Sequence, residues 1–368
     1  RRSSDLMAMK VSFFETGRYA VPPDLPREWP VPPAAYDPVL GAEAFQGMVE
    51  RARFVEKLGF DWISLSEHHY SPRILTPSPP LSAAFLASQV DTIKIALLGP
   101  IVPVSNPIRV AEELAMLDTM RPGRFVFGLL RGTTNEYLSY DLNPKEARER
   151  TDEGMELILK AWSEPQPFGW QGRYFQYRTV SIWPRPQTQP YPTTYALGVS
   201  AEAADFAARH RIGLGVSYGT VALMAQSTGY YRRRCADYGW EPGPDDIIWR
   251  ANMILAETDE AADAALARRS ANSQAPFPIS QGLRNALIEQ DKRNVGGERR
   301  PANVGGVLPI SFCGGPDRIV EQIRRAREEI GAGVLDLSLA DPGTAGTDAM
   351  LDSLDLFGRK VLPRIREI

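Results

Sequence analysis

The stretch FDWISL, residues 60–65, is the first of three apolar runs that decide the fold, and it is followed by KIALL at 94–98 and RFVFGLL at 124–130. Each run is rich in aliphatic and aromatic residues and has the length of a buried strand. Apolar residues at helical spacing fill the intervals, over 81–89 and 108–117. A strand–helix–strand order predicts parallel strands, because each helical crossover returns the chain to the same edge of the sheet.

The same alternation continues on both sides of this stretch. Strands are predicted at 10–14, 194–199, 212–216, 247–255 and 334–339, and helices at 45–58, 145–162, 201–209, 221–238, 259–269, 316–330 and 350–361. Eight strands in strict alternation with helices predict an α/β fold, an eight-stranded parallel (β/α) TIM-type barrel with insertions, which forms a single domain over 9–368. The alternative is an open doubly wound sheet, but the turn after the first strand, Glu15 to Arg18, lacks the glycine pattern of that fold.

The composition excludes several classes of protein. The 368 residues carry 42 basic and 45 acidic side chains, a formal charge of −3, without a basic stripe. A nucleic-acid groove or a site for anionic membranes is therefore not expected, and no apolar run approaches the ~20 residues of a membrane helix. The two cysteines, Cys235 and Cys313, form neither a disulfide framework nor a metal-ligand pair, which favours a reducing, cytoplasmic location.

Four segments depart from the strand–helix pattern. Residues 1–8 are expected to be a leader or an expression remnant. The Pro-rich segment 20–38 and the Trp- and Pro-rich segment 165–192 are expected to be insertions between barrel elements. A third insertion, 273–306, is rich in Gly, Pro, Asn and Arg. A loop of this length in a barrel is expected to be a lid, and the alternative is a disordered segment.

Candidate catalytic residues follow the second predicted strand. Active sites of such barrels lie at the carboxyl ends of the strands, and Ser66-Glu67-His68-His69-Tyr70 stands there. A histidine at this rim suits a general base, and the alternative is two histidines hydrogen-bonded within a loop. A metal site is not expected, because adjacent side chains leaving a strand point in opposite directions and the third histidine, His210, is far along the chain.

A phosphate site is predicted from Arg131 and Ser200. Ser200 precedes a predicted helix, whose N-terminus offers free N–H groups and a positive dipole end, and Arg131 follows the fourth strand as a bidentate donor. The alternatives are a plain helix cap for Ser200 and an ion pair of Arg131 with Glu136 or Asp141. Together the two residues indicate a small phosphate-bearing ligand.

Three stretches resemble the bacterial luciferase family of flavin-dependent monooxygenases: LSEHH at 65–69, PVSNPIRVAEELAMLD at 103–118 and GRFVFGLLRG at 123–132. The resemblance extends from Lys10 to about Arg364. It implies externally supplied reduced FMN that reacts with O₂ through a flavin C4a-(hydro)peroxide to oxygenate a small organic substrate. It also implies two protein partners, which are a separate NAD(P)H:flavin reductase, making the system two-component, and a second copy of the chain in a homodimer.

The same resemblance implies roles for individual residues. His68 corresponds to the catalytic histidine, and His69 and Tyr218 are expected to face the substrate cavity. The expected flavin contacts are Phe14, Leu98, Gly99, Arg131, Thr133, Gly198, Val199 and Ser200.

Two further functions stay open. One is a deazaflavin-dependent oxidoreductase that transfers hydride without oxygen, which the Glu67-His68-His69 pattern disfavours. The other is a catalytically silent flavin-binding protein, which the presence of His68 and Arg131 disfavours. For the monooxygenase, hydroxylation, Baeyer–Villiger insertion, epoxidation and carbon–sulfur cleavage are all compatible with the fold.

Overall fold

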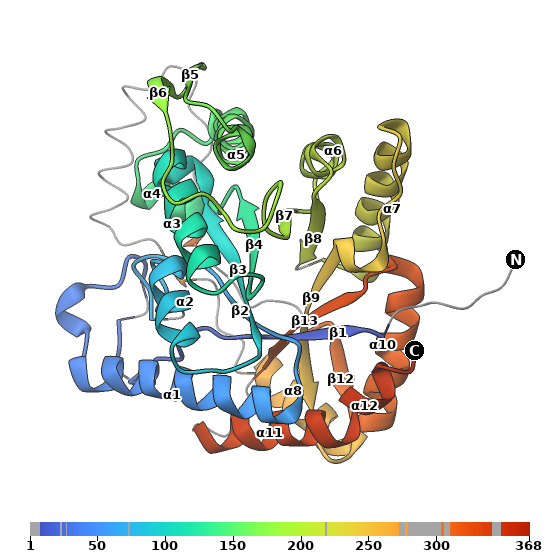
Figure 1. Ribbon diagram of the computed structural model, residues 1–368. Helices are drawn as coiled ribbons and strands as arrows, with labels where there is room; N and C mark the ends of the chain where they lie inside the picture. Colours follow the sequence, from blue (N-terminus) through green and yellow to red (C-terminus); the bar gives the residue numbers. More distant parts are fainter. Residues whose placement is uncertain are drawn as a thin grey trace, which may run out of the picture.

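The computed structural model describes residues 8–22, 24–26, 28–72, 74–217, 219–271, 277–278, 303–304, 310–340 and 347–368. The barrel strands are β1 (Lys10–Phe14), β2 (Trp62–Leu65), β3 (Lys94–Ile101), β4 (Phe125–Leu130), β7 (Thr194–Leu197), β8 (Gly213–Ser217), β9 (Ile247–Leu255) and β13 (Val334–Leu339). They pair in parallel in the order β9-β13-β1-β2-β3-β4-β7-β8, and β8 pairs with β9 to close the barrel (Figure 1). The predicted eight-stranded parallel TIM-type barrel is confirmed.

Helices surround this barrel (Figure 1). They are α1 (Pro38–Leu58), α2 (Pro79–Ala87), α3 (Pro107–Met120), α4 (Thr134–Ser139), α5 (Ala147–Ser163), α6 (Ala201–His210), α7 (Val221–Asp237), α8 (Asp259–Ala271), α10 (Pro316–Ile330), α11 (Thr347–Lys360) and α12 (Leu362–Ile365). Among the described residues, no helix combines the length and the apolar character needed to cross a membrane.

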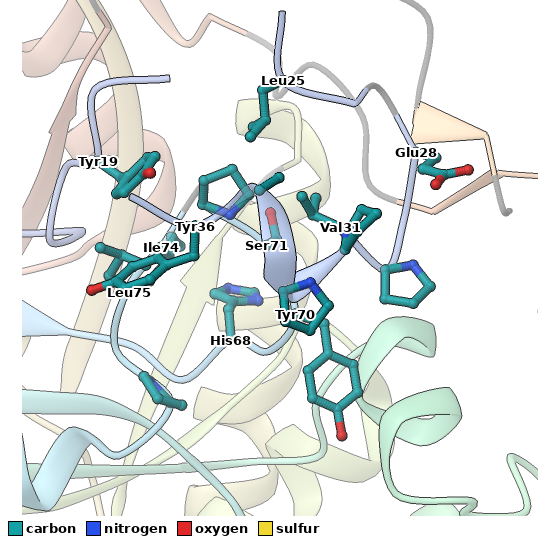
Figure 2. A pocket seen from close by; sticks show the side chains of 16 residues that line it. Tyr19, Leu25, Glu28, Val31, Tyr36, His68, Tyr70, Ser71, Ile74 and Leu75 are labelled. Carbon is teal, nitrogen blue, oxygen red and sulfur yellow. The ribbon is translucent and has the colours of Figure 1, made fainter. Parts of the chain in front are cut away.

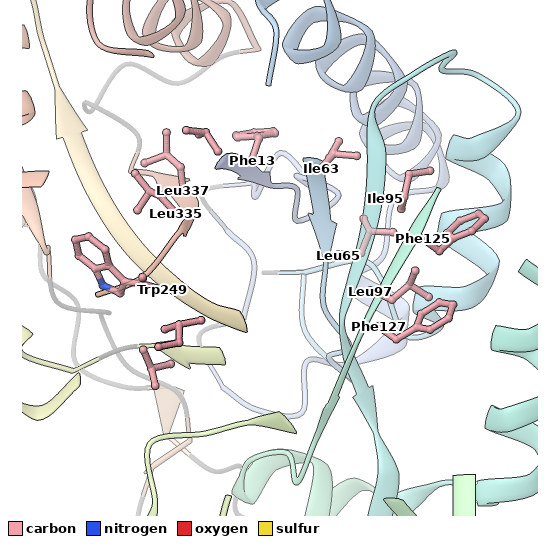
Figure 3. Close-up of a cluster of buried hydrophobic side chains, with 14 of the residues drawn as sticks. Phe13, Ile63, Leu65, Ile95, Leu97, Phe125, Phe127, Trp249, Leu335 and Leu337 are labelled. Atoms are coloured by element: carbon pink, nitrogen blue, oxygen red, sulfur yellow. The ribbon is translucent and has the colours of Figure 1, made fainter. Parts of the chain in front are cut away.

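Alternate residues of the barrel strands pack on opposite faces, which explains the apolar runs in the sequence. One set belongs to the main buried cluster, which the strands share with the surrounding helices, and includes Ile63, Leu65, Ile95, Leu97, Phe125 and Phe127 (Figure 3). The intervening residues belong to a second cluster, which includes Trp62, Ala96, Leu98, Val126 and Tyr195. The rings of Trp62 and Tyr195 lie 6.4 Å apart although their strands are not neighbours in the sheet, so this second cluster fills the barrel interior.

Side-chain caps set the helix boundaries. Asp37 accepts the Val39 N–H at 2.8 Å and starts α1 before Pro38, ahead of the predicted start at 45. The helix ends at Gly59, whose φ of 84° lies in the left-handed region that favours glycine. Helix α4 was not predicted, and its start carries a capping box formed by Thr133 and Glu136.

The insertions contain little regular structure. The described part of 20–38 contains the 3₁₀ turn Pro33–Ala35 and ends at the first residue of α1. Residues 165–192 include an antiparallel hairpin of β5 (Phe168–Gln171) and β6 (Gln176–Val180). Of the expected lid at 273–306, the structure describes only β10 (Phe277–Pro278) paired with β11 (Asn303–Val304), and the rest lies outside the described residues. A further short strand, β12 (Phe312–Gly314), extends the sheet beside β9.

A buried ion pair fixes the chain where it leaves β1. Arg51 of α1 donates to both carboxylate oxygens of Glu15, at 2.7 and 2.9 Å, and Gly17 donates its N–H to the same carboxylate at 2.8 Å. Glu15 is fully buried, so this attachment sets the path by which the 20–38 insertion leaves the barrel.

Candidate active site

A cavity of about 300 Å³ lies at the carboxyl ends of the barrel strands. Most of the predicted flavin contacts line it together with His68; these are Leu98, Arg131, Thr133, Gly198, Val199 and Ser200. Phe14 lies next to this lining, because the Arg250 guanidinium, itself part of the wall, stacks 3.7 Å from the centroid of the Phe14 ring. Tyr218 lies outside the described residues.

One end of the cavity is suited to an anion. Arg131 and Arg148 both line it, next to the N-terminus of α6. Arg148 pairs with Asp152, whereas Arg131 forms no ion pair with Glu136 or Asp141, all three of which the structure describes. Glu202, in the first turn of α6, has a lowered pKa. Its carboxylate accepts hydrogen bonds from its own backbone N–H and from the Ser200 hydroxyl, and the positive charges of Arg148 and Arg131 add to the effect. The field at this helix start is therefore positive.

Ser200 has a structural role here as well. Its hydroxyl oxygen accepts the Ala203 N–H at 3.3 Å, so it is the N-cap of α6. This cap fixes the first turn of α6 beside the cavity, which Val199, Ser200 and Ala203 line.

His68 is paired with a buried carboxylate. Its Nδ1 lies 3.0 Å from Oε1 of Glu136, which is 1% exposed. The other oxygen of Glu136 accepts the Thr133 N–H at 3.0 Å and the Thr133 hydroxyl. Burial alone would raise the pKa of Glu136, but the hydrogen bond and charge of His68 and the Thr133 hydroxyl outweigh it, so the pKa is lowered. The carboxylate is thus ionised at neutral pH and accepts a hydrogen bond from Nδ1–H of His68, so Nε2 is the ring nitrogen left for other contacts.

His69 occupies a different environment. It is buried, with Nε2 3.0 Å from Glu67 and Nδ1 3.5 Å from the Tyr140 hydroxyl, and its backbone carbonyl accepts the Trp29 indole N–H at 3.3 Å. His69, predicted to face the substrate, therefore belongs to a polar cluster that holds the loop after β2. It is absent from the described linings of the two cavities that His68 lines.

The lining combines apolar and polar side chains. Leu98, Leu130 and Leu197 are among the apolar ones. Among the polar ones, Asp336 accepts from Arg250 Nε at 2.6 Å and from the Ser64 hydroxyl at 2.7 Å. A cavity with arginines and a helix N-terminus among polar residues, together with apolar walls, fits a ligand that joins a phosphate to a planar ring.

Gly99 holds the histidine loop close to this wall. A Cβ at Gly99 would lie 2.4 Å from the Ser66 Cα and 2.5 Å from the Glu67 nitrogen. Only glycine allows β3 to approach the backbone that carries His68 this closely.

A second, larger cavity adjoins the first. It has a volume of about 630 Å³ and lies between the Pro-rich insertion and the loop after β2 (Figure 2). His68 is the one described residue common to the two linings.

Several site residues were not predicted. Glu136 was considered only as a partner for Arg131, although Thr133-Thr134-Asn135-Glu136 has the spacing of a capping box. Arg148, Arg250 and Asp336 carry no local signal, because the barrel alone brings them to the cavity. Among the residues that the structure describes, no group of three or more His, Cys, Asp or Glu side chains could hold a metal.

Sequence comparison places the chain among known proteins. A family model described as luciferase-like monooxygenase matches residues 28–333. The alkanal monooxygenase alpha chain of Aliivibrio fischeri is 22% identical over 332 residues, covering 85% of this chain and 91% of the relative. A protein of Sinorhizobium fredii is 28% identical over 192 residues, and that match spans about half of each chain, 52% of this one and 56% of the relative.

Solved structures share the fold. Monooxygenase RslO1 from Streptomyces bottropensis has a TM-score of 0.73 at 21% identity, with 96% of this chain and 99% of that chain covered. The oxygenating constituent of 3,6-diketocamphane monooxygenase from Pseudomonas putida, a type II Baeyer–Villiger monooxygenase in complex with FMN, has a TM-score of 0.70 at 19% identity over 97% and 99%. An F420-dependent secondary alcohol dehydrogenase has a TM-score of 0.68 at 15% identity over 98% and 99%.

At these identities the structural likeness shows the fold alone, and the sequence match establishes the family. The match covers most of the chain, and the strands that build the cavity lie mainly within it. The predicted resemblance is confirmed, and the chain belongs to the luciferase-like monooxygenase family.

Proposed function

We infer that the protein is a monooxygenase that uses reduced FMN and O₂ to oxygenate a small organic substrate. The observation that carries this proposal is the convergence of Arg131, the α6 N-terminus and His68 on one cavity. When bound, the reduced flavin supplies the two electrons with which one oxygen atom of O₂ enters the substrate and the other leaves as water.

Residues at the rim of the barrel are proposed to bind the flavin. Arg131, the Ser200-capped turn of α6 and Thr133 are proposed to hold the phosphate, and Leu98 and Gly99 to pack against the ring. Phe14, whose side chain the Arg250 guanidinium covers, is proposed to contribute to the same flavin site. These contacts would orient the ring beside His68, since positioning within a rigid rim is what such a barrel provides.

His68 is proposed to act as the general base. The ionised Glu136 holds the proton on Nδ1, so Nε2 takes up a proton from the reacting group on the cavity side. The apolar walls exclude water, which protects a reactive oxidant from wasteful breakdown.

Two partners belong to the proposal. Reduced FMN would come from a separate NAD(P)H:flavin reductase, as the sequence resemblance implies. The chain would also form a homodimer through α2 and α3, which contact each other. Leu81 and Phe85 on α2, and Met116 and Met120 on α3, are exposed apolar side chains one turn apart, and a second copy would cover them. Sedimentation analysis should give twice the mass of the 40.8 kDa chain.

The alternative is hydride transfer with a deazaflavin, the cofactor class of an F420-dependent dehydrogenase that shares this fold. The experiment that separates the two is anaerobic binding of reduced FMN or reduced deazaflavin, followed by mixing with oxygenated buffer. Oxygen-dependent formation of product with FMN supports the monooxygenase, whereas substrate oxidation by the deazaflavin without oxygen supports the dehydrogenase.

A further inference from the structure

The larger cavity is built by two segments that follow neighbouring strands of the barrel. One is the Pro-rich insertion after β1, and the other is the loop after β2 that carries His68 (Figure 2). Figure 2 shows the His68 ring among tyrosine and proline side chains, with Tyr19 and Tyr36 on one side of it. A ligand in this cavity would therefore meet the same imidazole that faces the proposed flavin site.

Hydrogen bonds make this cavity a preformed feature. Val31 donates its N–H to the Tyr70 carbonyl at 3.0 Å, and Trp29, which is buried, donates from its indole to the His69 carbonyl at 3.3 Å. Tyr70 has a φ of 59°, a left-handed conformation that a non-glycine residue keeps only when its surroundings hold it. At the other side, the Tyr19 and Tyr36 rings stack with centroids 5.9 Å apart, and the Tyr19 hydroxyl accepts the Asp37 N–H at 2.8 Å.

The described part of the lining contains few groups that would bind a charged ligand. Five prolines contribute to it, and proline has no N–H to solvate an anion. Among Asp, Glu, Lys, Arg and His residues, the described lining contains only Glu28 besides His68. Glu28 lies on the opposite side of His68 from Tyr19 and Tyr36 (Figure 2). A volume of about 630 Å³ suits a molecule of drug size, and aromatic and proline walls suit rings.

We propose that this cavity binds the organic substrate, and that the substrate is an uncharged, largely apolar, ring-containing molecule whose reacting group reaches His68. The proposal rests on the proposed function for the role of the occupant as substrate. The insertion at 20–38 then determines substrate choice, while the barrel rim holds the cofactor.

Binding of three naphthalene compounds tests this assignment. They share one ring system and carry a neutral acetyl group, a carboxylate or an aminomethyl cation, and their intrinsic fluorescence reports binding with and without FMN. The variants are Ala35→Trp, which fills the cavity, and Ala34→Trp, its neighbour in the same 3₁₀ turn, which is outside the lining. Glu28→Gln tests whether the carboxylate contributes.

The neutral compound should bind to the native protein, and Ala35→Trp should weaken it by about ten-fold or more, whereas Ala34→Trp and Glu28→Gln should leave it unchanged. Equal or tighter binding of either charged compound, absence of binding by the neutral compound, or equal effects of the two tryptophan variants would overturn the proposal. FMN affinity, measured on the same variants, is expected to be unchanged. Because the probes are also tested without FMN, failure of FMN to bind refutes the proposed function and not this assignment.

Discussion

Replacing Glu136 with glutamine tests whether a buried carboxylate prepares His68 to accept a proton. The two side chains are joined by the 3.0 Å contact between Oε1 and Nδ1, and Glu136 is 1% exposed, so water does not compete for this contact. Glutamine keeps the volume of glutamate and lacks its negative charge. The substitution therefore removes the charge while preserving the packing around α4.

The expected magnitude follows from the hydrogen bond. A hydrogen bond to a charged group contributes about 1.5–3 kcal/mol, and its loss from the transition state corresponds to a rate decrease of about 10–150-fold. We expect Glu136→Gln to slow oxygen-dependent product formation by a factor in this range. The affinity for FMN should fall less than the rate, because Thr133 is the one proposed phosphate contact with a described hydrogen bond to Glu136.

Rapid mixing of the FMNH₂ complex with oxygen, combined with product analysis, measures this rate. Asp141→Asn is the matched control, since it removes one carboxylate from the exposed residue that follows α4 without touching His68. A Glu136→Gln rate equal to that of the control would refute the reasoning. A loss of FMN affinity equal to the loss of rate would show that Glu136 acts on binding and not on His68.

The remaining predictions concern the phosphate end, the glycine contact, the buried ion pair and pH. Arg131→Ala should weaken FMN binding about 10–150-fold, from the loss of about 1.5–3 kcal/mol, and leave riboflavin binding unchanged in fluorescence titrations; an equal loss for riboflavin would remove Arg131 from the phosphate site. Gly99→Ala places a Cβ 2.4 Å from the Ser66 Cα, so a crystal structure should show the His68 loop displaced and the product rate should fall; an unmoved loop would contradict this. Glu15→Gln leaves the Arg51 charge buried without its partner and should lower the free energy of unfolding by about 3–5 kcal/mol in urea denaturation, whereas a change within error would show that the pair is dispensable. The pKa of Glu136 is lowered from its ordinary 4.5, so its ionised carboxylate stabilises the fold above about that pH, and this stabilisation is lost as the pH falls through the lowered pKa. His68→Gln removes the contact that lowers this pKa and leaves burial as the dominant effect, so in acid unfolding curves the loss of stability should begin at higher pH. Superimposable curves for the two proteins would exclude the coupling.

The barrel was predictable because its strands carry a strong local signal. Residues such as Ile63 and Leu97 face the helices while Trp62 and Leu98 face the interior, so both faces of a strand are apolar and the run stands out. The strands missed from the sequence are β5, β6, β10, β11 and β12, which are short and do not belong to the closed ring of eight strands. Their pairing depends on partners elsewhere in the chain, which a local pattern does not contain.

The candidate site was predictable only in part, for the same reason. Arg131 and Ser200 each follow a strand, and closure of the barrel is enough to bring them to one rim. The contact between His68 and Glu136 joins residues 68 positions apart, and the larger cavity depends on backbone hydrogen bonds such as that from Val31 to Tyr70. Backbone contacts of this kind leave little trace in the identity of the side chains.

A crystal structure of the protein with FMN tests the central claim most directly. The account predicts the phosphate within hydrogen-bonding distance of Arg131 and the first turn of α6, with the ring against Leu98 and Gly99 and facing Nε2 of His68. A flavin in the larger cavity, or a phosphate held away from Arg131, would contradict it.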